Sequence, residues 1–228
     1  MAELAAIVGN SGQGKSTSIR TLDPNTTFII NVASKPLPFK GAKKVYKSLT
    51  KDGEKWVGNL YNTSDVNKIN QILTMIDKTK PEIKTVVIED AQYLMAFEAM
   101  DRANEKGYDK FTQIATNFYS VLKKVINMRD DLKVFVLTHA ENVGDSLSPS
   151  WKIKTIGKMI DSMITIEGLF TYVFFTHVEK DDNDVMQYKL ITQTDGTTTA
   201  KTPLGCFEDL LIDNDLQYIC NKIDEYNE

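Results

Sequence analysis

Residues 9–16 have the sequence GNSGQGKS and match the pattern G-x-x-x-x-G-K-[ST], which is typical of a phosphate-binding glycine loop. The apolar run LAAIV at 4–8 precedes it and predicts a buried strand, and residues 17–22 predict a helix that ends at Asp23-Pro24. A strand, a glycine loop and a helix start direct several backbone N–H groups to one point, with the positive end of the helix dipole behind them. The stretch therefore predicts a polyphosphate site, the alternative being a chance glycine-rich turn.

The residue types in this loop indicate ATP and Mg²⁺ as cofactors. Lys15 can reach the β- and γ-phosphates of a nucleoside triphosphate, and the Ser16 hydroxyl can ligate Mg²⁺. The glycines permit the tight path of the chain. The residues that we expect to contact the nucleotide are Gly9, Asn10, Ser11, Gly12, Gln13, Gly14, Lys15, Ser16 and Thr17.

Length and composition limit the class of protein. A chain of 228 residues is long enough for one substantial α/β domain, so we expect a single domain over residues 1–228. Apolar residues make up 42% and charged residues 25%, which is ordinary for a globular protein and gives no sign of disorder. Because the net charge is −4, any nucleic acid has to bind to a local basic surface.

Cysteine spacing and apolar run length indicate the compartment. Cys206 and Cys220 are far from any C-x-x-C spacing, so we expect buried small side chains and neither a disulfide nor a metal site. No apolar run approaches membrane-spanning length, and the first predicted strand begins too early for a signal peptide. We therefore expect a cytoplasmic protein with no membrane partner.

Strand and helix patterns alternate over most of the chain. Apolar runs predict strands at 27–32, 85–88 and 134–137, and helical spacing predicts helices from about 65 to 80 and from 111 to 125. This alternation predicts an α/β fold with a mostly parallel central sheet flanked by helices.

The pattern changes after Gly168. The β-rich segments 169–178, 186–193 and 197–200 are joined by turns, so we expect antiparallel hairpins toward the C-terminus. The acidic turn at 181–184 lacks the glycine and the distal glutamate of a calcium-binding EF-hand loop, and we interpret it as a solvated turn.

Two carboxylates follow the strand at 85–88. A P-loop enzyme needs an acid at the end of a neighbouring strand to hold the Mg²⁺ shell and to position water. We expect Glu89 to act through the metal and Asp90 toward the attacking water, although their order stays open. The alternative is an acidic strand end that faces solvent.

Other candidate catalytic residues lie on the later elements. His139, at the end of the strand at 134–137, is placed to donate to the γ-phosphate, and a structural histidine is the alternative. His177 lies in the β-rich part and is interpreted as structural. Arginines are scarce and not clustered, which disfavours the arginine-bearing lid of a small-molecule kinase. A cation that acts on a neighbouring subunit must then be a lysine, and Lys201, on a turn between a hairpin strand and a helix, is our candidate; a solvated lysine is the alternative.

Two lysine-rich stretches could hold a polymer. The first covers residues 35–55, with aromatic side chains among the lysines and a hairpin turn predicted at Asp52-Gly53. The second is the predicted loop at 141–158, directly after His139. Cations beside aromatic rings suit single-stranded nucleic acid, whereas the alternative for both stretches is a solvated charged face with inward-packed rings. The residues that we expect to bind DNA are Trp151, Lys152, Lys154 and Lys158.

Several phrases resemble phage-encoded RecA-like ATPases, a group that includes the Sak-type recombination proteins. The resemblance extends to about Asp213 and is carried by residues 9–20, 31–41, 88–95 and 199–205. It implies a RecA-like core, ATP hydrolysis, and the binding or annealing of single-stranded DNA in phage recombination or replication. It also implies that the loop at 141–158 contacts DNA, that Lys201 crosses a subunit interface, and that the protein acts in the host cytoplasm.

The chain departs from RecA in two places, and these departures leave open which of several functions it performs. RecA has a catalytic glutamate after its second strand, whereas residues 32–35 contain no acid, and the acid that is usually Asp is Glu89 here. Our main expectation is a DNA-stimulated ATPase that assembles as a homo-oligomer with ATP between subunits and has a possible single-strand-binding-protein partner. The alternatives are an ATP-switched helicase loader with little turnover and, less favoured, a small-molecule phosphotransferase.

Overall fold

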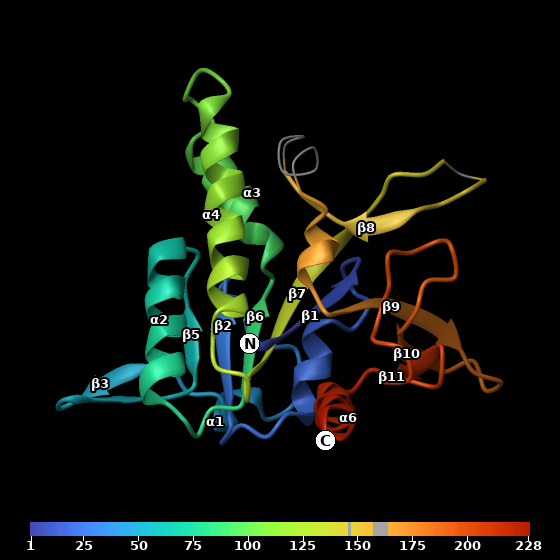
Figure 1. The fold of residues 1–228 in the computed structure, drawn as a ribbon, viewed down its shortest axis with the longest axis horizontal. Helices are drawn as coiled ribbons and strands as arrows, with labels where there is room; N and C mark the ends of the chain where they lie inside the picture. The colour runs from blue at the N-terminus through green and yellow to red at the C-terminus, as the bar shows by residue number, and fades with distance from the viewer. Residues whose placement is uncertain (146, 157–163) are drawn as a thin grey trace.

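The computed structural model describes residues 1–145, 147–156 and 164–228, and one large sheet organises them (Figure 1). The strand order is β11-β10-β9-β1-β7-β6-β2-β5, and the short β8 pairs with the outer part of β7. The strands are β1 (Glu3–Gly9), β2 (Thr27–Asn31), β5 (Leu60–Asn62), β6 (Thr85–Glu89), β7 (Lys133–Asn142), β8 (Trp151–Ile153), β9 (Tyr172–Lys180), β10 (Met186–Ile191) and β11 (Leu211–Asp213). A separate hairpin contains β3 (Thr50–Asp52) and β4 (Lys55–Val57).

Helices cover both faces of the sheet. In the described residues these are η1 (Ser16–Thr21), α1 (Ala42–Val45), α2 (Val66–Thr79), α3 (Gln92–Asp101), α4 (Asp109–Ile126), η2 (Ile166–Leu169) and α6 (Leu216–Asn227). Across the sheet, the six adjacent strands β5, β2, β6, β7, β1 and β9 pair in parallel, whereas β10 and β11 pair antiparallel at one edge. The predicted mostly parallel sheet, with an antiparallel hairpin toward the C-terminus, is confirmed.

Successive residues of each central strand enter two different cores. In β1, Ala6 and Val8 pack with α2, α3 and α4, while Ala5 and Ile7 pack with η1 and α6. Because both faces are covered, the strands are continuous apolar runs and not alternating ones. Residues of α2 such as Leu73, and of α4 such as Phe118, are buried at the helical spacing that predicted these helices.

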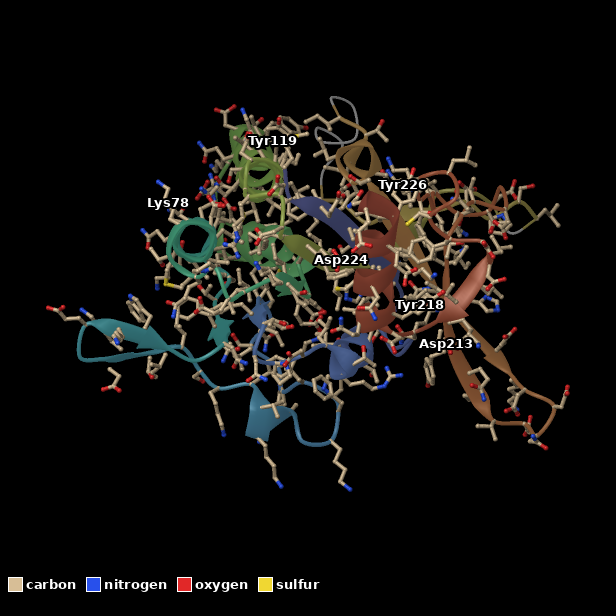
Figure 2. All side chains as sticks on the ribbon, turned by 60° about the horizontal axis from the view of Figure 1, so that its bottom comes forward. Lys78, Tyr119, Asp213, Tyr218, Asp224 and Tyr226 are labelled. Carbon is tan, nitrogen blue, oxygen red and sulfur yellow. The ribbon has the colours of Figure 1, made fainter. Side chains whose placement is uncertain are left out.

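The C-terminal helix closes the second core. Leu216, Ile219 and Ile223 of α6 are buried, and the Asp215 side chain caps the helix by accepting from the Tyr218 N–H at 2.9 Å. Figure 2 labels Asp224 on α6, and this carboxylate forms an ion pair with Lys133 at the start of β7 at 2.5 Å. Cys206 and Cys220 are buried and free, in agreement with their interpretation as small core side chains.

The structure corrects four local predictions. The helix after the glycine loop is a 3₁₀ helix that ends at Thr21. Residues 197–200 form no strand; Thr198 and Lys201 make isolated bridges, and turns rather than a helix follow Lys201. The strand with His139 continues to Asn142 and pairs with β8, so much of the predicted loop at 141–158 is a hairpin. Finally, β6 is not a neighbour of β1, because β7 lies between them.

Candidate active site

The glycine loop lies at the carboxyl end of β1 and needs glycine at two positions for different reasons. Gly14 has a φ of +86°, a conformation that side chains disfavour. Gly9 has no such φ, but a Cβ there would fall on the hydroxyl of Thr176 in β9 and lie 2.9 Å from its Cβ. The first glycine is therefore required by the close approach of another strand.

Side chains from distant segments hold the loop in this shape. The Gln13 Oε1 accepts from the Asn10 N–H at 2.7 Å and from the Thr176 hydroxyl at 2.8 Å. The Asn214 amide donates to the Gly14 carbonyl at 2.9 Å. No sequence motif marked Thr176 or Asn214, because only the packing of β9 and of the segment after β11 brings them to the loop.

Lys15 lies folded back on its own loop. Its ammonium donates to the carbonyls of Gly9 at 2.8 Å and Asn10 at 2.9 Å, and the residue is buried. Burial holds the pKa of Lys15 below its ordinary value, against the opposing effect of the nearby carboxylates Glu89 and Asp90. The ammonium thus lies beside the loop in contacts that a phosphate oxygen can replace.

Ser16 and Glu89 are in contact although β7 lies between the strands β1 and β6 that lead to them. The Ser16 hydroxyl donates to Oε1 of Glu89, while the other carboxylate oxygen of Glu89 is buried without a hydrogen-bond partner among the described residues. Burial raises the pKa of Glu89 to about 7, although the Ser16 hydroxyl opposes this shift. A buried carboxylate with one unsatisfied oxygen beside a hydroxyl is a donor set suited to a hard divalent cation.

Asp90 is held on a strained turn directly after β6. Its φ is +58°, which is unusual for a residue other than glycine. One carboxylate oxygen lies 2.5 Å from Nζ of Lys35, and the other lies 3.8 Å from Nε2 of His139. Burial alone would raise the pKa of Asp90, but its interactions with His139 and with the Lys35 ammonium bring the pKa below its ordinary value.

A cavity of about 470 Å³ joins these groups. His139 is in register with Gly9 across the β1–β7 pair, and its ring meets that of Tyr93 edge to face at 5.7 Å. The lining residues are Ser11, Gly12, Gly14, Lys15, Ser16, Thr17, Arg20, Lys35, Pro38, Asp90, Tyr93, His139, Tyr188 and Asn214. The cavity therefore brings together the loop, one strand-end acid and the predicted sensor.

Four candidate residues lie away from this cavity. Lys201 bridges Val173 of β9 through two backbone hydrogen bonds of 2.8 and 2.9 Å. Trp151 is half-buried against the α2–α4 core, Lys152 is ion-paired with Glu141 at 3.3 Å, and Lys154 is exposed. Lys158 lies outside the described residues.

The first lysine-rich stretch only partly matches its prediction. The hairpin turn at Asp52-Gly53 is confirmed by β3 and β4. However, Tyr46 is buried and Phe39 packs against it at 6.2 Å, so these two rings form core and not a base-stacking platform. Trp56, which directly follows this stretch on β4, has an exposed ring. Lys35 was expected to lie on this basic surface, whereas the fold places it in the cavity.

A family model described as an AAA domain, AAA_24, matches residues 3–204. The genome packaging NTPase B204 from Sulfolobus turreted icosahedral virus 2, solved in complex with ATP-gammaS, aligns over 80% of this chain and 78% of its own, with 10% identity and a TM-score of 0.41. No curated protein sequence matches this chain.

Within the described residues, no helix combines the length and apolar character needed to cross a bilayer. The same residues contain no cluster of three or more His, Cys, Asp or Glu side chains that could hold a metal ion. A metal at Ser16 and Glu89 would therefore need phosphate oxygens or water to complete its shell.

Proposed function

Since this chain belongs to the AAA domain family and has a P-loop NTPase fold, we propose that it hydrolyses Mg²⁺-ATP in the cavity and couples hydrolysis to single-stranded DNA. The observation that carries the proposal is the meeting of Lys15, Ser16, Glu89 and Asp90 at one end of the sheet. In the folded chain these four residues come from two strand ends that a third strand separates.

The nucleotide would lie along the cavity, with its phosphates at the loop. Lys15 exchanges its two loop carbonyls for β- and γ-phosphate oxygens. Ser16 and Glu89 hold Mg²⁺, which the unsatisfied oxygen of Glu89 favours. When bound, this ion neutralises charge on the phosphate oxygens.

Asp90 and His139 act on the water and on the γ-phosphate. Asp90 orients a water molecule, whose oxygen forms a bond to the γ-phosphorus as the bond to the bridging oxygen of ADP breaks. The water proton passes to Asp90 and then to solvent, and the products are ADP and inorganic phosphate. His139 donates to the γ-phosphate from its place beside Asp90.

A structural link connects the site with the proposed DNA surface. The strand that carries His139 continues into the β7–β8 hairpin, which projects from the body of the protein in Figure 1. The N–H of Lys154 donates to the His139 carbonyl at 2.8 Å. A displacement of His139 by the γ-phosphate would thus move Lys152 and Lys154, whose charges suit a DNA backbone.

The biological setting follows from the resemblance in the sequence. Residues 88–95 and 199–205 are similar to the Sak-type recombination group, so we propose a role in phage recombination or replication in the host cytoplasm. The active form would be a homo-oligomer in which Lys201 reaches the nucleotide of a neighbouring subunit. A single-strand-binding protein is a further possible partner.

An ATP-switched assembly module is the second candidate function. It is favoured by the ion pair between Asp90 and Lys35, which occupies the proposed base. In such a module, ATP binding would change the hairpin and turnover would be slow.

Steady-state ATPase measurements with and without single-stranded DNA separate the two candidates. Strong stimulation by DNA supports the first, and tight ATP binding with little turnover supports the second. Under either candidate function, Lys15→Ala should abolish ATP binding, because it removes the cation from the loop. Unchanged affinity for ATP in this variant would refute the phosphate site itself.

A further inference from the structure

Lys35 occupies a central position that no motif predicts. It follows β2 on a turn where Ser34 has a φ of +57°, and it lines the same cavity as Lys15 and Ser16. Its Nζ lies 2.5 Å from Oδ2 of Asp90 and 5.3 Å from the ring centroid of Tyr93. A lysine is thus held between the strand-end acid and an aromatic face, in the cavity that the glycine loop also lines.

The two members of this ion pair differ in their freedom to move. The Lys35 side chain is 59% exposed, whereas that of Asp90 is 6% exposed and fixed by the strained turn after β6. A lysine that keeps most of its hydration can leave the carboxylate without stranding itself in the interior. The same move would leave the buried Asp90 carboxylate without its lysine partner, so another charge has to attract Lys35.

The other cations of the cavity are already engaged. Lys15 serves the glycine loop, and the Arg20 guanidinium donates to the carbonyls of Thr17 and Asn214, each at 3.0 Å. Three Lys or Arg side chains are found among the described lining residues. Of these three, Lys35 differs in that its charged group pairs with a carboxylate and not with backbone carbonyls. It also lies on the side of the cavity where Asp90 and His139 are found.

We propose that Lys35 is a further γ-phosphate ligand of this ATPase, which leaves its ion pair with Asp90 for a γ-phosphate oxygen when ATP binds. The proposal rests on the proposed function. The transfer replaces one carboxylate partner with a phosphate of higher charge, and it frees Asp90 to take the proton of the attacking water. Lys35 would supply from the same chain the cation that many such enzymes obtain from an arginine.

This assignment makes Lys35 a sensor of which nucleotide is bound. ADP has no γ-phosphate, so Lys35 returns to Asp90 after phosphate leaves, and their ion pair forms again. The contribution of Lys35 should therefore be confined to triphosphates. A lysine that merely stabilised the turn after β2 would affect ATP and ADP alike.

The test compares Lys35→Ala and Lys35→Arg with the control Lys44→Ala, which removes an exposed lysine of the same stretch. Affinities for ADP and for a non-hydrolysable ATP analogue are measured, together with kcat and KM for ATP. We expect Lys35→Ala to weaken binding of the ATP analogue by about 10- to 100-fold, because one charge-assisted hydrogen bond is lost, and to leave the affinity for ADP almost unchanged. Lys35→Arg should recover most of the analogue's affinity, and kcat should fall in Lys35→Ala.

Two results would overturn the proposal while leaving the ATPase assignment intact. One is an equal loss of affinity for ADP and the analogue, which would indicate a structural role. The other is no loss in Lys35→Ala while the wild-type protein hydrolyses ATP in a Lys15-dependent manner. If the wild-type protein neither binds nor hydrolyses ATP, the proposed function fails as well, so the two failures are distinguishable.

Discussion

The Ser16 hydroxyl donates to the Glu89 carboxylate although the strands that lead to these residues are not neighbours. Between β1 and β6 lies β7, whose Thr138 pairs with Val8 and whose Val136 pairs with Ile88. The contact is therefore made across the width of β7, in the region of the buried Thr138 and not at the end of that strand. This arrangement leaves room at the sheet end for Asp90 and His139 beside the same phosphate site.

Replacing Glu89 with Gln should stabilise the metal-free, nucleotide-free protein at alkaline pH. The folded-state pKa of Glu89 is raised to about 7, so folding favours its neutral form. The associated stability is present at acidic pH and is lost as the pH rises from the ordinary glutamate range through about 7. Because Glu89 is buried, Glu89→Gln should gain on the order of 3 kcal/mol over wild type at pH 8.

Chemical denaturation in EDTA at pH 5 and pH 8 measures this difference. The gain should shrink at pH 5, where the wild-type carboxyl is largely protonated. ATP hydrolysis in the same variant should fall sharply, since an amide is a poor ligand for Mg²⁺. An equal gain at both pH values would contradict the assigned pKa.

Replacing Gly9 with Ala should weaken ATP binding by about tenfold or more, because its Cβ would displace the Thr176 hydroxyl that supports Gln13. Adding Thr176→Ala should recover part of the affinity, as it removes the oxygen on which the new Cβ falls. Gly168→Ala is the matched control, since a Cβ there meets nothing nearer than 3.9 Å. Calorimetric titration with ATP measures all three, and wild-type affinity in Gly9→Ala would disprove the packing argument.

Neutralising Lys152 and Lys154 together should weaken single-stranded DNA binding and reduce its salt dependence. Two lost phosphate contacts lower the slope of log K against log salt by about 1.4. Lys51→Ala with Lys55→Ala on the β3–β4 hairpin is the control, with the same change in charge. Fluorescence anisotropy over a salt series provides the slopes. A loss confined to the control pair would move the DNA site to that hairpin.

Mixing two inactive variants tests whether Lys201 acts on a neighbouring subunit. Lys15→Ala subunits would keep Lys201, and Lys201→Ala subunits would keep the phosphate loop, so some interfaces in a mixture contain both. An equimolar mixture should then regain about a quarter of the wild-type ATPase rate, provided subunits combine at random in a head-to-tail assembly. Full activity of Lys201→Ala on its own would remove this residue from the site.

Much of the fold could be predicted because local sequence patterns report burial directly. The residues at 86–88 and 134–137 are apolar throughout because both faces of the sheet are covered, and the helix Val66–Thr79 lies within its predicted range of about 65 to 80. A prediction that was wrong concerned residues whose backbone partners lie far away in the sequence. Residues 197–200 were expected in a hairpin strand, but Thr198 instead forms an isolated bridge with Trp151, and the next residue after the segment, Lys201, bridges Val173.

By itself, the sequence determined the phosphate loop, the two strand-end acids and the class of fold, because these depend on glycine spacing, apolar periodicity and short-range order along the chain. Only the tertiary structure decided which side chains support the phosphate loop and line the cavity beside it. Lys35, Thr176 and Asn214 reach the loop from separate segments, and strand order alone sets β7 between Ser16 and Glu89. These contacts depend on strand order and sheet register. Both are set by pairing between segments that are far apart in the sequence, and local sequence patterns do not report such pairing.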